Sequence, residues 1–234
     1  MKIMSKILPC LAFMALPFLG FSQNFWEVTL TPGAIAYYGD IPVPYVTFKE
    51  THLAGQLAIK RYFNGEHAIR LGVLHGTISG NDANYTGHSS RGNKFIGTLT
   101  EFSVMGEIDL RGRKRYTKKL GYQKTWSSYV TFGLSGIYCN PVVTYGQQTN
   151  KDLGIEYPDW HFGMPLGGGF KKDINERLFI GAEAGLRLTL SDYLDGTQAS
   201  GNAYRNDAFF FGGVSVGYRF QKKRANLPKV PTKA

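Results

Sequence analysis

Apolar and polar residues alternate along most of the chain after residue 25. In the first such segment, Trp26, Val28 and Leu30 fall on one face, and Glu27 and Thr29 fall on the other. A period of two residues predicts a β-strand with one apolar and one polar face. The sequence after residue 25 is therefore read as a succession of extended strands.

Eight segments share this alternation, and turn-forming residues separate them. They span about 26–38, 52–63, 67–78, 95–110, 126–140, 161–171, 178–190 and 208–220. Each has at least the roughly 9–11 residues that a β-strand needs to cross the hydrocarbon of a bilayer. An even number of strands lets the last pair with the first, which removes unpaired edges. The pattern predicts an all-β fold, an eight-stranded antiparallel transmembrane β-barrel of the outer-membrane type with up-and-down topology.

The composition of the polar face decides which side of the sheet meets lipid. A soluble sandwich or a lipocalin-like barrel would turn the apolar face inward and expose many lysines. Here the polar face is rich in glycine and carries Glu27, Lys60, Arg70, Glu101, Glu107, Glu183 and Arg187. Such residues fit a narrow lumen in which charges pair across the barrel. We therefore expect the apolar face on lipid, with aromatic girdles at Trp26, Tyr38, Phe63, Trp126, Tyr138 and Phe220.

The N-terminal segment is typical of a signal peptide. Lys2 and Lys6 precede an apolar run, 7–21, and Gly20 and Ser22 place small residues before a cut after Ser22. The run is too short to span a bilayer as a helix, and no later segment has eighteen consecutive apolar residues. We expect a signal peptide over 1–22, a barrel over 23–220 and a basic periplasmic tail over 221–234. Removal of the signal peptide leaves Cys139 as the single cysteine, so no disulfide forms within the chain.

The excess of positive charge is concentrated at one end of the predicted barrel. Outer-membrane barrels begin and end in the periplasm, which makes 39–51, 79–94, 141–160 and 191–207 outer loops and 64–66, 111–125 and 172–177 inner connections. The chain has 27 Lys and Arg against 17 Asp and Glu. Segment 111–125 carries seven of these bases and segment 221–234 carries five, and neither has an acid.

This basic inner end has two interpretations. It docks an acidic periplasmic partner, with Arg111, Arg113, Lys114, Arg115, Lys118, Lys119, Lys222, Lys223 and Arg224 as the candidate residues. Alternatively, segment 111–125 is a protruding hairpin whose lysines lie near anionic lipid phosphates. The predicted location excludes nucleic acid as a partner.

Several phrases then point to a known family. They are Tyr38-Gly39-Asp40, the segment 78–82, "TEFSVMGEIDL", "MPLGGGFK" and "GAEAGLRLTLSDYLDG". Over about 25–220 the sequence resembles the PorG-like outer-membrane barrel component of the type IX secretion system. The most specific phrase, Asp192-Tyr193-Leu194-Asp195, follows a Gly-x-Arg-x-Thr strand. The motif residues in loops are Gly39, Asp40, Asp82, Asp192, Tyr193 and Asp195. The "SRGNKF" segment and the basic tail depart from the family pattern.

The resemblance implies a non-enzymatic part of the export and gliding machinery. Such barrels associate on the periplasmic side with a large ring built from a lipoprotein and a soluble ring protein. The basic inner end is compatible with that contact. The alternative is a stand-alone, OmpX-like small barrel that acts through its outer loops in adhesion or envelope integrity.

The sequence does not favour catalysis, metal binding or transport. His75 is expected on the lipid face and Ser103 on the lumen face, so this pair cannot meet as in a lipid A hydrolase. Asp40, Asp82, Asp192, Asp195 and Asp207 could hold a divalent cation, but aspartates in turns usually bond their own backbone. Gly167, Gly168 and Gly169 indicate close backbone packing, and side chains fill an eight-stranded interior. We therefore expect no enzyme activity, no cofactor, no metal and no small-molecule substrate.

Overall fold

The computed structural model describes residues 25–38, 50–84, 92–117, 121–146, 158–191, 194, 196 and 207–220. The predicted signal peptide, 1–22, and the predicted tail, 221–234, lie outside them. The elements are β1 (Phe25–Tyr38), β2 (Thr51–Tyr62), β3 (His67–Asn81), η3 (Asp82–Asn84), β4 (Lys94–Asp109), α2 (Gly112–Arg115), β5 (Tyr116–Thr117), β6 (Gly121–Tyr122), β7 (Trp126–Thr144), β8 (Trp160–Asp173), β9 (Leu178–Thr189) and β10 (Ala208–Phe220).

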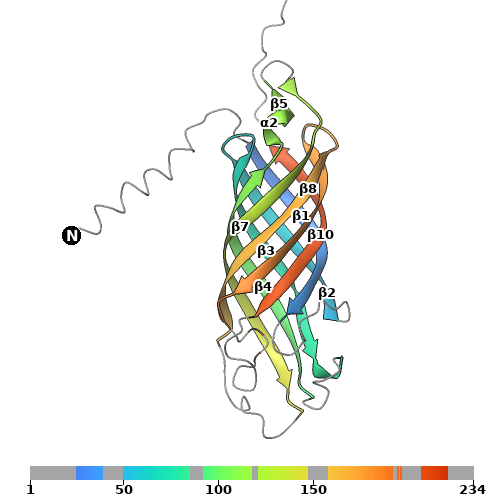
Figure 1. Cartoon of the computed structure of the whole chain (residues 1–234), viewed down its shortest axis with the longest axis vertical. Coiled ribbons are helices and arrows are strands. Elements are labelled where there is room, and N and C mark those ends of the chain that lie inside the picture. The colour runs from blue at the N-terminus through green and yellow to red at the C-terminus, as the bar shows by residue number, and fades with distance from the viewer. Residues whose placement is uncertain are drawn as a thin grey trace, which may run out of the picture.

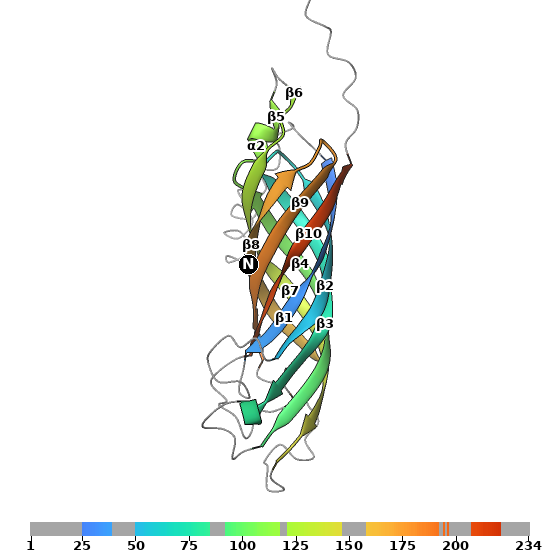
Figure 2. The same ribbon diagram turned by 90° about the vertical axis from the view of Figure 1, so that its right-hand side faces the viewer.

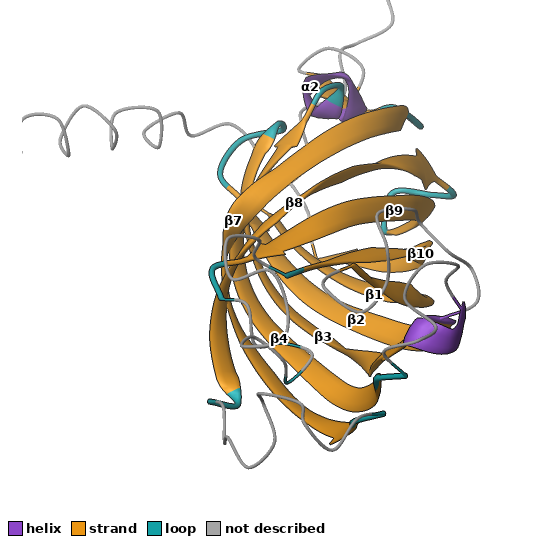
Figure 3. Cartoon of the chain, turned by 60° about the horizontal axis from the view of Figure 1, so that its bottom comes forward, coloured by secondary structure: helices purple, strands orange, loops and turns teal. Residues whose placement is uncertain are grey.

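Eight of these strands close into an antiparallel barrel, as predicted. Their order around the wall is β1-β10-β9-β8-β7-β4-β3-β2. The first and last strands pair from Trp26 opposite Phe220 to Tyr38 opposite Ala208. Figure 1 shows the tilted strands along the long axis, and Figure 3 shows them surrounding the lumen. The end that holds Phe25 and Phe220 is called the inner end below, following the orientation of outer-membrane barrels.

The two faces of each strand are oriented as the alternation predicted. In β3, Arg70 is fully buried, whereas its neighbour Leu71 is 53% exposed. The same contrast between a buried polar and an exposed apolar neighbour recurs at Glu27 and Trp26. A wall whose apolar side chains point outward and whose charges point inward is the arrangement of a membrane barrel. No helix within the described ranges is both long and apolar enough to cross a membrane.

Aromatic rings lie near both ends of this apolar wall. Trp26, Trp126 and Phe220 are exposed at the inner end, and Trp160 is exposed at the outer end. Trp160 was not among the predicted girdle residues because the predicted strand began one residue later. Rings with one apolar and one polar side are typical of the two interfaces of a bilayer.

Three strands are longer at the outer end than the sequence indicated. β3 and β4 pair as far as Asn81 opposite Lys94, and β4 and β7 pair as far as Lys94 opposite Thr144. β7 was expected to end at Asn140, one residue before Pro141, and it continues to Thr144. Proline is tolerated here because β8 no longer pairs with β7 beyond Tyr138, so the missing N–H removes no bond to β8. The three strands project beyond the rest of the barrel (Figures 1 and 2).

The lumen is divided into two parts, a division that was not predicted. The inner and middle parts hold charged side chains, and the outer part holds an apolar cluster. This outer plug comprises Ile35, Tyr37, Leu74, Ile78, Phe95, Leu99, Ile137, Cys139, Leu194, Phe209 and Phe211. Cys139 is buried in it, as expected for a small core residue, and its Sγ lies 3.6 Å from the Leu194 carbonyl. Apolar packing therefore fills the barrel beneath its outer mouth.

The glycine run in β8 packs as predicted. A Cβ added to Gly169 would lie 2.3 Å from the Ala182 carbonyl oxygen and 2.7 Å from the Tyr129 hydroxyl oxygen. Both distances are shorter than any van der Waals contact allows. The run exists because β7, β8 and β9 approach one another closely at this point and leave no room for a side chain.

Candidate functional site

The charged part of the lumen is balanced between the two signs. Among the residues that the structure describes, its buried members are six acids and six bases: Glu27, Glu101, Glu107, Asp109, Asp173 and Glu183, with Lys60, Arg70, Arg115, Lys171, Arg187 and Arg219. All seven of the charged residues assigned to the polar face in advance are among them. Buried charges persist when each has an oppositely charged partner and hydrogen bonds. Because acids and bases are equal in number, the buried charges in this part of the lumen neutralise one another.

The middle of the lumen is crossed by one bidentate ion pair. Arg70 on β3 donates from both terminal nitrogens to the two carboxylate oxygens of Glu183 on β9, at 2.7 Å each. β3 and β9 lie on opposite sides of the closed wall. The Tyr129 hydroxyl also donates to Glu183, at 2.7 Å. This pair ties two opposite strands together, and farther out Arg187 and Glu101 pair at 3.3 Å.

Nearer the inner end, the Glu107 carboxylate contacts two lysines and a tyrosine hydroxyl. Lys171 Nζ lies 2.5 Å from one of its carboxylate oxygens, and Lys60 Nζ lies 2.9 Å from the other. The Tyr62 hydroxyl donates to Glu107 at 2.6 Å. Lys60 also reaches Glu27, at 3.2 Å. Because these ion pairs connect β1, β2, β4 and β8, four of the eight barrel strands, this layer fixes the cross-section of the barrel.

The inner mouth is closed by Arg115, the last residue of α2. Its guanidinium lies 3.2 Å from Asp109 and 3.0 Å from Asp173, and it donates to the Ser127 hydroxyl at 3.0 Å. Burial alone would lower the pKa of Arg115, but attraction from Asp109 and then Asp173 outweighs it and raises the pKa above the ordinary value. Arg219 approaches the other oxygen of Asp173 at 2.8 Å. Arg115 therefore closes the mouth as a charged cap.

The segment that carries Arg115 is held against the barrel at its base. A Cβ on Gly112 would lie 1.6 Å from the Gly65 carbonyl oxygen, so α2 begins in direct contact with the β2–β3 turn. The Asp109 amide donates to the Glu66 carbonyl at 2.7 Å. Beyond α2, β5 and β6 pair as a short hairpin, with Tyr116 opposite Tyr122. Figure 2 shows α2, β5 and β6 standing beyond the inner ends of the barrel strands.

The structure separates the predicted docking residues into different environments. Arg111 and Lys114 are exposed, and the Arg111 guanidinium stacks 4.2 Å from the centre of the Trp126 ring. Arg113 lies in α2. Arg115 must be removed from the docking set, because its side chain is buried and used inside the mouth. Lys118, Lys119, Lys222, Lys223 and Arg224 lie outside the described residues, so their docking role stays a prediction.

Two of the outer-mouth aspartates are described, and both bind backbone groups. Asp82 is buried in η3 and accepts from the Asn93 amide at 2.9 Å. Asp207 is buried and accepts from the Tyr37 hydroxyl and, at 2.8 Å, from the Leu194 amide. These contacts favour a structural role for both. No group of three potential metal-ligating side chains occurs within the described ranges. Gly39, Asp40, Asp192, Tyr193 and Asp195 lie outside those ranges.

The histidines behave partly as expected. His75 is exposed on the outer wall and bonds Thr100 at 2.9 Å, while Ser103 is buried in the lumen, so the two are separated. Sequence reasoning missed another pair, His161 Nδ1 with Ser191 Oγ at 2.7 Å. The other ring nitrogen, Nε2, is buried with no hydrogen-bond partner in the described part of the chain. Within the described residues, no carboxylate hydrogen-bonds the His161 ring to orient it toward Ser191, as the base of an activated serine is oriented.

A family model described as Domain of unknown function (DUF6089) matches residues 5–227. The chain belongs to this family. Among curated proteins, none matches it. The DUF6089 description carries no link to type IX secretion, so the family resemblance is confirmed only to the level of a small outer-membrane barrel.

Several solved eight-stranded barrels are similar to this DUF6089 chain. Ail of Yersinia pestis, solved with the heparin analogue sucrose octasulfate, is 10% identical, with a TM-score of 0.48 and coverage of 85% of this chain and 100% of Ail. OprG of Pseudomonas aeruginosa is 9% identical, with a TM-score of 0.49 and coverage of 87% and 99%. Neisserial surface protein A is 10% identical, with a TM-score of 0.46 and coverage of 84% and 97%. The closed strand order and the apolar outer wall make this DUF6089 chain an outer-membrane β-barrel.

Proposed function

We propose that this barrel is a non-enzymatic anchor that presents its inner-end hairpin, 111–125, to a periplasmic assembly. The observation that supports it most is the way the hairpin base is fixed. Arg115 is tied to Asp109 and Asp173 inside the mouth, and Gly112 abuts the β2–β3 turn. Buried ion pairs fix the point at which this connection leaves the barrel, which lowers the entropic cost of docking.

The polarity of that hairpin supports an acidic partner. Segment 111–125 has seven basic residues and no acid. One of the seven, Arg115, is buried in the inner mouth and balances lumen acids, which leaves six basic residues of the segment for a partner. Positive charge on a protruding element accelerates association with an acidic surface and favours one orientation of it.

We further propose that the assembly is the periplasmic ring of the type IX secretion machinery, with a lipoprotein and a soluble ring component as partners. This assignment rests on the sequence resemblance described above, above all on the loop phrase 192–195. It is the finer part of the proposal, and it can fail while the anchoring role stands.

One observation favours a second function, a stand-alone barrel that acts at its outer end. β3, β4 and β7 project beyond the other strands and form a three-stranded platform over 77–81, 94–98 and 140–144. Projecting strands of this kind present a surface outside the membrane, where adhesion would occur. The platform requires no periplasmic partner.

Charge reversal of the hairpin separates the two functions. Arg113, Lys114, Lys118 and Lys119 are changed to Glu, and Arg115 is left intact so that the cap survives. A matched variant, Lys94→Glu, alters an exposed cation at the outer end. Anchoring predicts loss of protein export and of periplasmic partners in a pull-down for the hairpin variant alone. If export and the pull-down are unchanged while outer-end changes abolish adhesion, the stand-alone function is correct.

A further inference from the structure

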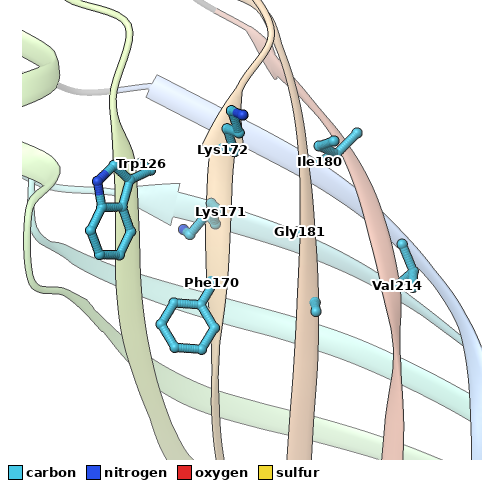
Figure 4. A pocket seen from close by; sticks show the side chains of 8 residues that line it. Trp126, Phe170, Lys171, Lys172, Ile180, Gly181 and Val214 are labelled. Carbon is cyan, nitrogen blue, oxygen red and sulfur yellow. The ribbon is translucent and has the colours of Figure 1, made fainter.

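A groove on the membrane-facing wall adjoins the inner rim. It has a volume of about 500 Å³ and lies across β7, β8, β9 and β10, with Trp126, Phe170, Lys172, Ile180, Ala182 and Val214 in its lining. Figure 4 shows the Trp126 and Phe170 rings on one side and Ile180 and Val214 on the other. Its size is within the range of sites that bind small molecules.

The strand register explains the hollow. Phe170, Ala182 and Val214 stand opposite one another on three adjacent strands. One step nearer the rim, Trp126, Lys172 and Ile180 form a second such row. Ala182 therefore lies between two larger side chains in its own row and beside Ile180 in the other. Its short side chain leaves the hollow open toward the bilayer.

The end of the groove that faces the rim is positively charged. Lys172 is exposed on the outer face of β8, and no ion pair to it occurs within the described ranges. Arg111 lies beside it, because its guanidinium stacks on Trp126, the register partner of Lys172. A lysine at the end of an apolar strand extends its ammonium toward the lipid headgroups. The groove thus pairs an apolar floor with two cations at headgroup depth.

We propose that this groove is a binding site for one anionic phospholipid of the inner leaflet. An acyl chain lies along Ala182 between Phe170 and Val214, and the phosphate and headgroup charge meet Lys172 and Arg111. The charge arrangement argues for this occupant, because basic pockets at the membrane surface bind anionic headgroups. A second copy of the chain would have to bury Lys172 against an apolar wall, which is costly.

The test uses residues 23–234, refolded in a mild non-ionic detergent, and native mass spectrometry. Phosphatidylglycerol and phosphatidylcholine with identical acyl chains are added in turn. We expect one phosphatidylglycerol per barrel, bound roughly 30-fold more tightly than phosphatidylcholine, because two surface cations contribute about 1 kcal/mol each. Equal retention of both lipids, or a protein dimer free of lipid, would overturn the proposal.

Two variants with matched controls locate the site. Ala182→Leu fills the groove, while Ala184→Leu makes the same change one row deeper on the same face. Lys172→Gln removes the cation, while Arg61→Gln removes a rim cation from β2, on the opposite side of the wall. The proposal predicts about fivefold weaker phosphatidylglycerol binding for Ala182→Leu and Lys172→Gln and no change in the controls. If all four variants bind alike, the groove is not the site. Since Lys172→Gln alters only an exposed side chain, it tests the proposal even if Ala182→Leu does not fold.

Discussion

The ion pair between Arg70 and Glu183 gives the sharpest prediction about stability. The perturbations are Arg70→Met, Glu183→Gln and the double variant. At the observed 2.7 Å, two unit charges interact by about 6 kcal/mol with an effective dielectric constant of 20. The net effect of removing one partner is smaller, roughly 3–5 kcal/mol, because neighbours partly compensate. After Arg70→Met, Tyr129 still donates to Glu183, and after Glu183→Gln, Glu107 remains 3.9 Å from Arg70.

The double variant distinguishes a true pair from two separate contributions. When both charges are removed, no buried charge is left without a partner. The double variant should therefore lose about as much unfolding free energy as one single variant. The coupling free energy, the sum of the two single losses minus the double loss, should then be about 3–5 kcal/mol. Unfolding by guanidinium in phospholipid vesicles, followed by tryptophan emission, measures it. Arg61→Met, at the rim, serves as a control and should shift the free energy by less than about 0.5 kcal/mol. Additive losses in the double variant would refute a lumen held by this pair.

Further predictions concern the wall, the inner mouth and the outer end. Leu71→Arg places a cation on the lipid side and should lower the unfolding free energy by about 2–4 kcal/mol in vesicles, whereas Leu71→Ile should not; equal stability would contradict lipid contact. Arg115→Ala removes the ion pairs that tie the hairpin to Asp109 and Asp173, and limited proteolysis should then cut segment 111–125 faster than in the Arg115→Lys variant; unchanged cleavage would show that the cap does not hold the hairpin. Ser191→Ala should leave the lipid A mass spectrum of the producing cells unchanged, and a shifted acylation pattern would refute the non-enzymatic proposal.

The sequence predicted which residues face lipid and which face the lumen, because the alternation within each strand assigns its two faces. Alternation places Arg70 and Leu71 on opposite faces whatever the neighbouring strands do. The end of β7 was harder to place, because Pro141 stops a strand only where a partner needs its N–H. That need depends on where β8 ends, which is a tertiary property.

Arg115 was misassigned because it lies in a basic run that reads as exposed. The unequal numbers of acidic and basic residues predicted for the lumen could have indicated that Arg115 is buried. The predicted lumen face had more acids than bases, and a buried excess of one sign is unstable. The acid at the end of β4, Asp109, required a nearby cation, and the adjoining connection was the closest source.

The outer plug also left a trace in the sequence. In 34–36 and in 208–211 the alternation fails, because Ile35, Phe209 and Phe211 make the second face apolar as well. Such runs mean that both faces avoid water. Their convergence into one cluster with Cys139 and Leu194 depends on the register of strands far apart in the chain, which alternation within one strand cannot supply.

The most direct test of the membrane assignment uses the three native tryptophans, Trp26, Trp126 and Trp160, all of which are exposed on the outer wall. Residues 23–234 are refolded into vesicles whose acyl chains carry bromine at a chosen depth. The account predicts strong quenching of tryptophan emission, greatest for bromine near the headgroups, and weak quenching by iodide in the water. Efficient iodide quenching with no effect of bromine at any depth would contradict it.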